Sequence, residues 1–241
     1  MIPNKNMSEQ NNPSDSSNKT LVWDLPIRIF HWLLVILILS QWLTAEILED
    51  TINWHLIGGY ILLGLVFFRL LWGFIGTPYA LFKNFLFPPR TIINYAASLP
   101  NRKSTVYAGH NPLGGLVVLL MLVLILLLTI SGLFMDDEIL TSGPYFGVVS
   151  EYWQQTMSTI HHTSFDILSI LIGLHIAAII FYRLFKGQKL VSAMWHGYKD
   201  AAAVGIKKQR IVLAMVVASI IALAVYVLVY VLPPQDLEMY Y

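Results

Sequence analysis

Residues 112–135 read PLGGLVVLLMLVLILLLTISGLFM, and residues 116–130 within this stretch contain neither a charged residue nor a glycine. An α-helix needs about 20 apolar residues to cross the roughly 30 Å of hydrocarbon in a bilayer. Four further apolar stretches of similar length accompany it, at 27–45, 53–75, 160–185 and 211–232. The sequence therefore predicts an all-α membrane protein with five transmembrane helices.

The composition supports the same class. Of the 241 residues, 56% are hydrophobic and only 12% are charged, with a mean hydropathy of +0.64. These values exclude a soluble enzyme, a disordered chain and a nucleic-acid-binding protein, and they make membrane lipid the expected surrounding. The chain has no cysteine, which excludes disulfides, iron–sulfur clusters and covalent c-type haem. Any cofactor must therefore be held by His, Met or carboxylate side chains.

Two segments outside the spans have a distinct character. Residues 1–20 are polar and lack an apolar run, so we expect a disordered tail rather than a signal peptide. Residues 76–111 contain four prolines, two of them adjacent, which predicts an interfacial loop or a short amphipathic helix. Asn111 and Pro112 have the residue types of a helix cap and a first helical position.

The loop charges predict the orientation. All fifteen Lys and Arg residues lie before the first span, between the second and third, between the fourth and fifth, or at the span ends that face those segments. In the other connections and the C-terminal tail, the charged residues are all acidic: Glu46, Glu49, Asp50, Asp136, Asp137, Glu138, Glu151, Asp236 and Glu238. The positive-inside rule places the N-terminus in the cytoplasm and the C-terminus on the outer side of the membrane.

Four histidines are the candidate metal ligands, because ionisable groups in a membrane span are costly and are often functional. His161 and His175 are fourteen residues apart, so they lie within about 40° of one face of a helix and about 21 Å apart along it. His162 falls well off that face. By depth, His55 pairs with His161 near the outer surface, and His31 pairs with His175 on the cytoplasmic half.

Two bis-histidine sites at two depths of a helix bundle match the needs of two b-type haems, since each iron takes one axial nitrogen from either side. A closed zinc site needs four ligands, which makes zinc the weaker fit. The alternative is that these histidines are hydrogen-bonded core residues or interfacial residues. That alternative is weakest for His175, which lies well inside a span.

Further residues near the cytoplasmic pair are candidates for cofactor binding. Arg28, Arg69 and Arg183 could pair with haem propionates or extend to lipid head groups. His110 is a candidate cofactor contact or simply part of a helix start, whereas His196 is expected to be solvated. Small residues allow close helix packing in any membrane protein, and beside the proposed ligands they would also leave room for a flat macrocycle: Gly58, Gly59, Gly64 and Gly173.

Several stretches together resemble the bacterial cytochrome b561 and nickel-hydrogenase cytochrome b family. They are 22–32 (VWDLPIRIFHW), 69–76 (RLLWGFIG), 109–114 (GHNPLG), and His161 followed by His175-Ile176. The resemblance covers roughly residues 22–199. It implies a four-helix bundle with two b haems whose ligands fall on the four histidines named above. Where the family often has Glu after the first histidine of the fourth span, this chain has His162.

The resemblance implies electron exchange between a periplasmic redox partner, such as a c-type cytochrome or a hydrogenase, and the membrane quinone pool. The domain organisation expected is a tail at 1–20, a dihaem domain at 21–200 and an additional transmembrane helix at 210–232. Two other functions remain open on the sequence. One is a stand-alone haem oxidoreductase that oxidises a small periplasmic reductant or superoxide and reduces quinone. The other is a haem-free transporter or assembly subunit.

Overall fold

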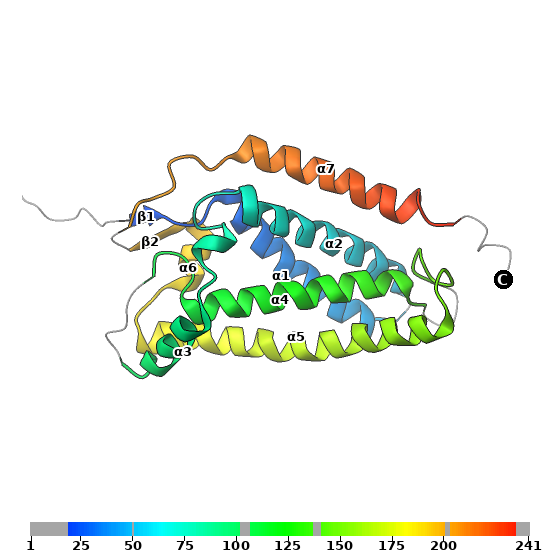
Figure 1. The fold of residues 1–241 in the computed structure, drawn as a ribbon, viewed down its shortest axis with the longest axis horizontal. Coiled ribbons are helices and arrows are strands. Elements are labelled where there is room, and N and C mark those ends of the chain that lie inside the picture. Colours follow the sequence, from blue (N-terminus) through cyan, green and yellow to red (C-terminus); the bar gives the residue numbers. More distant parts are fainter. Residues whose placement is uncertain (1–18, 50, 102–106, 137–140, 201–202, 235–241) are drawn as a thin grey trace, which may run out of the picture.

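The computed structural model of the protein describes residues 19–49, 51–101, 107–136, 141–200 and 203–234. Its elements, in chain order, are β1 (Lys19–Leu21), α1 (Leu25–Glu46), α2 (Ile52–Ile75), the 3₁₀ turn η1 (Phe82–Asn84), α3 (Pro89–Ser98), α4 (Pro112–Ser131), the 3₁₀ turn η2 (Gly132–Phe134), α5 (Glu151–Phe185), α6 (Leu190–His196), β2 (Tyr198–Asp200) and α7 (Ile211–Tyr230) (Figure 1).

Five of these helices, α1, α2, α4, α5 and α7, are long and apolar enough to cross a membrane, which confirms the predicted all-α membrane fold. The ends of four of them agree with the sequence expectation to within a few residues. By contrast, α5 begins at Glu151, nine residues before the apolar stretch. The segment 151–159 is polar, and hydropathy detects only the part of a helix that contacts lipid.

The helices form a bundle in which α2 is central. It packs against α1, α4 and α7, while α4 packs along α5 (Figure 1). A cluster of buried side chains joins α2, α4 and α5: Leu62 and Val66 of α2, Ile125 and Leu128 of α4, and Leu168 of α5. Among the described residues, α1 and α5 are not closely packed against each other. The bundle therefore holds together through α2 and α4.

The fifth spanning helix, α7, lies on the outside of α2 (Figure 1). Its buried residues follow a helical spacing along one face: Ala214, Val217, Ile221, Val225 and Val229. A side-chain carbon at Gly64 of α2 would be in ordinary contact with Ile221 and Val225. Gly64 therefore belongs to the α2–α7 packing, which is the first of the two roles expected for these small residues.

The connection from α2 to α4 contains the short turn η1 and the helix α3, as its prolines predicted. Pro88 caps α3 and Pro89 is its first residue, where the missing N–H costs nothing. The expected start of α4 is also confirmed, because the Asn111 side chain accepts a hydrogen bond from Gly114 N at 2.7 Å and Pro112 follows it.

A two-stranded sheet closes one end of the bundle. β1 and β2 pair antiparallel, with Thr20 opposite Lys199, and Val22 N donates to Gly197 O at 2.8 Å. The sheet thus includes Lys19 and Thr20, the last two residues of the expected tail, while residues 1–18 lie outside the described part. It holds the start of α1 beside the end of α6.

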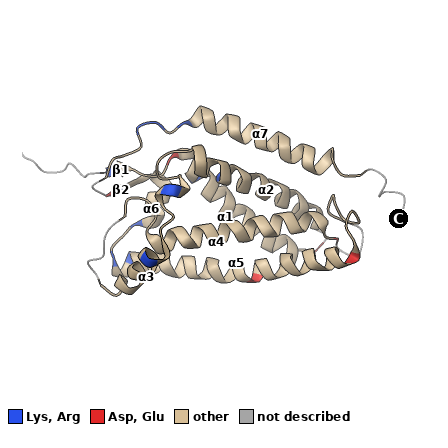
Figure 2. Cartoon of the chain, in the orientation of Figure 1, with Lys and Arg blue, Asp and Glu red and all other residues tan. Residues whose placement is uncertain are grey.

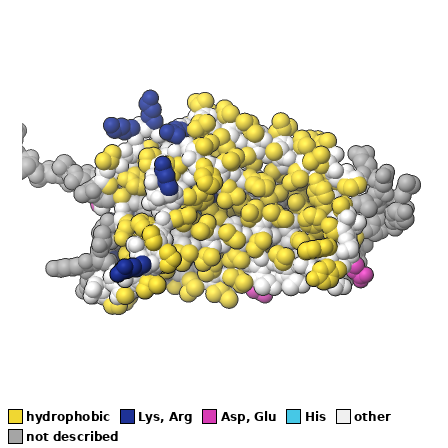
Figure 3. Space-filling model, in the orientation of Figure 1, with side chains coloured by type: hydrophobic (Ala, Val, Ile, Leu, Met, Phe, Trp, Pro, Cys, Tyr) yellow, Lys and Arg dark blue, Asp and Glu magenta, His cyan; other side chains and the backbone are white. Residues whose placement is uncertain are grey.

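The two ends of the bundle differ in charge. Lys and Arg gather at the end that carries β1, β2, α3 and α6, and apolar side chains cover the surface between the ends (Figures 2 and 3). At the opposite end the exposed charges are acidic, as at Glu46, Glu49, Asp136 and Glu151. We call the end with β1, β2, α3 and α6 the basic end and the opposite end the acidic end.

One buried carboxylate organises the basic end. Asp24 is 1% exposed, and its Oδ1 accepts from Ile27 N at 2.7 Å, which caps α1. Its Oδ2 accepts from Trp72 Nε1 at 3.3 Å and from the Thr77 hydroxyl. This side chain therefore ties the start of α1 to the end of α2.

We expect Asp24→Ala to lower the free energy of unfolding by about 2–4 kcal/mol, because it removes a helix cap and leaves two buried donors without an acceptor. Unfolding by SDS titration in mixed micelles measures the change. Asp200→Ala, at an exposed carboxylate of β2, is the control and should change stability by less than about 0.5 kcal/mol. Equal effects of the two variants would contradict this role for Asp24.

Candidate metal centres

Two histidines face each other near the acidic end. The rings of His55 on α2 and His161 on α5 have centroids 6.4 Å apart and planes inclined by 63°. Imidazole nitrogens bind a metal ion at about 2 Å, so two rings on opposite sides of one ion have centres about 6 Å apart. The separation of these rings therefore suits a shared axial position.

Hydrogen bonds fix the orientation of both rings. His161 Nδ1 lies 2.9 Å from Leu128 O and 3.2 Å from Ser131 Oγ on α4. His55 Nδ1 lies 3.2 Å from Gln41 O and 3.4 Å from Thr44 Oγ1 on α1. Because a carbonyl can only accept, Nδ1 carries the proton in each ring and Nε2 is left with a free lone pair. This is the usual outer support of a histidine ligand.

The neighbouring histidine is placed differently. His162 is exposed, and its ring contacts that of His161 at 5.9 Å without approaching His55. The structure thus places His161 opposite His55, as the helical spacing predicts. Gly132 lies directly beside this site, since an added side-chain carbon would be 3.2 Å from His161 Cε1. Gly132 and the four hydrogen-bond partners could not be predicted from the sequence, because they belong to no motif and become neighbours of the histidines only in the folded chain.

The second pair lies toward the basic end. His31 on α1 and His175 on α5 are both half-buried. No direct ring contact between them is found in the described part of the chain. His31 Nδ1 is buried and has no hydrogen-bond partner. This pair is therefore more open than the pair near the acidic end.

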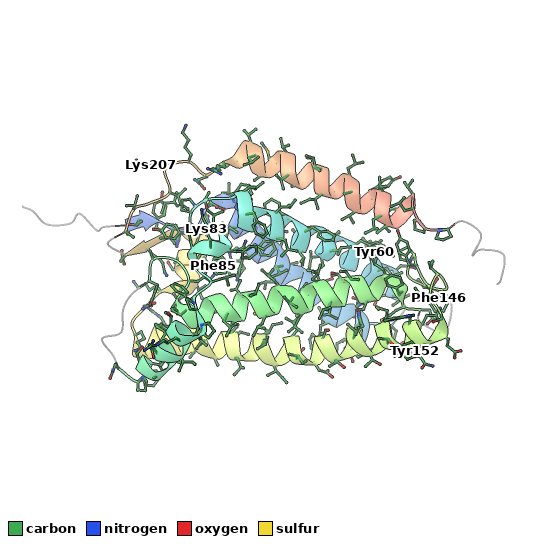
Figure 4. All side chains as sticks on the ribbon, viewed as in Figure 1. Tyr60, Lys83, Phe85, Phe146, Tyr152 and Lys207 are labelled. Atoms are coloured by element: carbon green, nitrogen blue, oxygen red, sulfur yellow. The ribbon has the colours of Figure 1, made fainter. Side chains whose placement is uncertain are left out.

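Arg69 and His110 lie together in an aromatic setting beside it. The Arg69 guanidinium, on a residue that is 3% exposed, sits over the rings of Phe82 and Phe85 at 4.9 and 5.5 Å. His110 packs between Phe85, labelled in Figure 4, and Trp23, with ring centroids 4.7 and 4.8 Å away. Burial, together with the positive charges of Arg69 and Lys199, lowers the pKa of the His110 imidazole to about 3.

The other two arginines are more exposed. Arg28 donates from Nη2 to Trp195 O at 2.5 Å, which joins α1 to α6. Arg183 is exposed and lines a groove of about 560 Å³ between α5 and α6, together with Ile179, one turn beyond His175, and His196. His196 is itself exposed and bonds only to Ser192 within the described residues, as expected for a solvated residue.

Buried polar atoms without a partner concentrate near the His31–His175 pair. Of the six such side-chain atoms in the described residues, five lie there: Arg28 Nε, His31 Nδ1, Trp32 Nε1, Arg69 Nη1 and His110 Nδ1. Buried donors of this kind are nearly always paired in native proteins. An anionic group with several acceptor oxygens, such as the two propionates of a haem, fits this set.

The ligand number also fits haem. Within the described residues, no three His, Asp or Glu side chains gather to hold a metal ion by themselves. A pair of histidines therefore suits a metal that already has its equatorial ligands, as porphyrin iron does. At Gly173 an added side-chain carbon would meet nothing within 4 Å, so no described side chain packs against this position.

Comparison with known proteins gives two matches and one absence. Residues 22–197 match the family described as prokaryotic cytochrome b561. A probable Ni/Fe-hydrogenase B-type cytochrome subunit from Rhizobium leguminosarum bv. viciae is 25% identical over 215 aligned residues, which cover 74% of this chain and 89% of that protein. No solved structure matches. The matched region contains both histidine pairs and the candidate arginines.

The depressed pKa of His110 predicts a pH dependence of stability. Between pH 7 and pH 5 the unfolded chain takes up a proton at this residue, with a pKa near 6.5, whereas the folded protein does not until about pH 3. Lowering the pH from 7 to 5 should therefore decrease the free energy of unfolding by about 2 kcal/mol more in the unsubstituted protein than in His110→Gln. SDS titrations at both pH values measure this difference, and parallel pH profiles would contradict it.

Proposed function

The chain belongs to the prokaryotic cytochrome b561 family, and from this premise we propose that it carries electrons across the membrane through two b-type haems, between a periplasmic redox protein and the quinone pool. Family membership makes it an integral-membrane b-type cytochrome of electron transport and sets aside the haem-free transporter. The number of haems, their ligands, the orientation and the partners are proposals, supported below by the geometry of the described residues.

The outer haem is assigned to His55 and His161. The observation that carries this assignment is the facing arrangement of the two rings, with Nδ1 of each committed to a backbone carbonyl. Both rings thereby keep Nε2 available for iron. When bound, the haem supplies reversible one-electron chemistry, and the protein supplies ligation, orientation and an apolar surrounding.

The haem near the cytoplasm is assigned to His31 and His175, with Arg28, Arg69, Arg183 and His110 as partners of its propionates. The unpaired donors Arg69 Nη1 and His110 Nδ1 support this assignment. Arg69 is suited to hold a carboxylate because its buried guanidinium lies over aromatic rings. His110 can donate one hydrogen bond from its neutral ring without bringing a second charge into the site.

One helix relates the two sites in depth. Fourteen residues of α5 separate His161 from His175, a rise of about 21 Å. The two ligands from α5 therefore lie at two depths of the apolar layer, which is about 30 Å thick, and the chain can position two redox centres in its two halves. Electron transfer between the two membrane surfaces follows from this spacing.

The orientation we propose places the basic end in the cytoplasm and the acidic end in the periplasm of a bacterial inner membrane. The N-terminus is then cytoplasmic and the C-terminus periplasmic. A periplasmic redox protein, hydrogenase-like or a c-type cytochrome, would meet exposed carboxylates at Glu46, Glu49, Asp136 and Glu151. The similar Rhizobium protein is named as a hydrogenase cytochrome subunit, which favours a protein donor over a small reductant.

Single histidine substitutions test the ligand assignment. His55→Ala and His161→Ala should each remove the outer haem, and His31→Ala and His175→Ala the cytoplasmic one, so that the haem content falls from two to one per chain. The pyridine haemochrome spectrum against protein concentration measures it. His162→Ala, which changes the adjacent exposed histidine, is the matched control and should keep two haems. Loss of a haem in His162→Ala with two haems kept in His161→Ala would contradict the assignment.

Thiol labelling tests the orientation, since the chain has no cysteine of its own. Ser142→Cys lies at the acidic end and Ser192→Cys at the basic end, and both positions are exposed. In spheroplasts an impermeant maleimide should label Ser142→Cys and leave Ser192→Cys unmodified until the membrane is disrupted. The reverse pattern would refute the proposed topology.

A further inference from the structure

α5 carries a polar face that contacts no other helix in the described structure. Six exposed residues with spacings of three and four form this face: Thr159, His162, Asp166, Ser169, Gly173 and Ala177. Such spacing places them on one side of the helix. By helical rotation this side is turned well away from His161 and His175, which face the bundle. We call it the outward face of α5.

The outward face lies partly at membrane depth. α4 and α5 run antiparallel, with Ser131 Oγ 3.2 Å from His161 Nδ1 at one end and Asn111 Nδ2 3.0 Å from the Tyr182 hydroxyl at the other. Since α4 is apolar throughout, the segment of α5 between His161 and Tyr182 spans the same layer. Asp166 is five residues inside it, about 7.5 Å along the axis. Figure 2 shows acidic positions both at the start of α5 and partway along it.

An ionisable side chain at that depth is costly unless it has a partner. Asp166 is exposed and forms no hydrogen bond or ion pair within the described residues. Its possible donors are His162 one turn nearer the periplasm and Ser169 one turn deeper, both on the same outward face. The face thus contains an acceptor flanked by two donors, so it is complementary to itself.

The inner half of the outward face suits close helix packing. Ser169, Gly173 and Ala177 follow one another at intervals of four, the small-residue pattern through which transmembrane helices associate. Nothing lies within 4 Å of a side-chain carbon added at Gly173. Helices that cross at these small residues diverge toward their ends, where the larger His162 and Asp166 side chains would fill the wider space.

From these observations we infer that the outward face of α5 binds the same face of a second copy, and that the protein is a homodimer in the membrane. A two-fold axis along the membrane normal brings equal depths of the two α5 helices together. Asp166 of each copy then accepts hydrogen bonds from His162 or Ser169 of the other. A second copy is favoured over an unrelated helix because the face carries both halves of the polar contact.

Disulfide cross-linking in this cysteine-free chain tests the dimer. Ser169→Cys and Gly173→Cys in native membranes, treated with copper phenanthroline, should give a cross-linked product of twice the monomer mass. Ser219→Cys on α7 is the matched control, because it is also an exposed serine within a span. We expect at least about tenfold more dimer at Ser169 than at Ser219, in line with the strength of polar and small-residue helix contacts.

Three results would overturn the inference: no dimer from either α5 variant, equal cross-linking at Ser219, or a product containing a different polypeptide. Within the Ser169→Cys background, Asp166→Leu should reduce the dimer about tenfold and Asp166→Asn should largely retain it. Unchanged cross-linking in Asp166→Leu would equally reject the polar contact. Haem content is measured on the same samples, so failure of the dimer is distinguishable from failure of the ligand assignment.

Discussion

The hydrogen bonds that hold Nδ1 of His55 and His161 are the interactions on which the proposed outer haem site depends. Each ring must present Nε2 to the space between α2 and α5, and a histidine can do so only if its other nitrogen is held. The carbonyl of Leu128 supplies this support from α4, and that of Gln41 from α1. Four helices therefore contribute to a proposed site with two ligands. α2 and α5 supply the histidines, and α1 and α4 hold those histidines in orientation.

The two ends of the bundle are prepared to different degrees. Near the acidic end the histidines are hydrogen-bonded and face each other, so little rearrangement is needed to accept iron. Near the basic end, buried nitrogen atoms of Arg28, Arg69 and His110 have no hydrogen-bond acceptor among the described residues. Binding of an anionic cofactor would satisfy them, so under the proposed haem assignment the assembly of this site would be coupled to insertion of its haem. The Asp24 contacts to Trp72 and Thr77 keep this end in place.

Much of this arrangement could be predicted from the sequence, where a single physical rule applies. Membrane thickness sets the length of the spans, and helical rotation distinguishes His161 from His162. The remainder depends on tertiary contacts. The contact between the Leu128 carbonyl and His161 and the packing of aromatic rings around Arg69 cannot be predicted from a motif. The polar start of α5 cannot be predicted from hydropathy. The spacing of four residues between His162 and Asp166 is visible in the sequence, but it does not show whether their shared face packs against another helix. Gly173 is two residues from His175 in sequence, yet that rotation of about 200° turns it to nearly the opposite side of α5.

Transmembrane electron flow in a purified system tests the central claim most directly. The haem-loaded protein is reconstituted into liposomes that enclose ferricyanide, and a membrane-impermeant reductant is added outside. Two redox centres spaced across the bilayer predict that the enclosed ferricyanide is reduced at a rate proportional to the amount of protein, while protein-free liposomes stay oxidised. Rapid reduction of the haems from outside with the enclosed ferricyanide remaining oxidised would contradict the account.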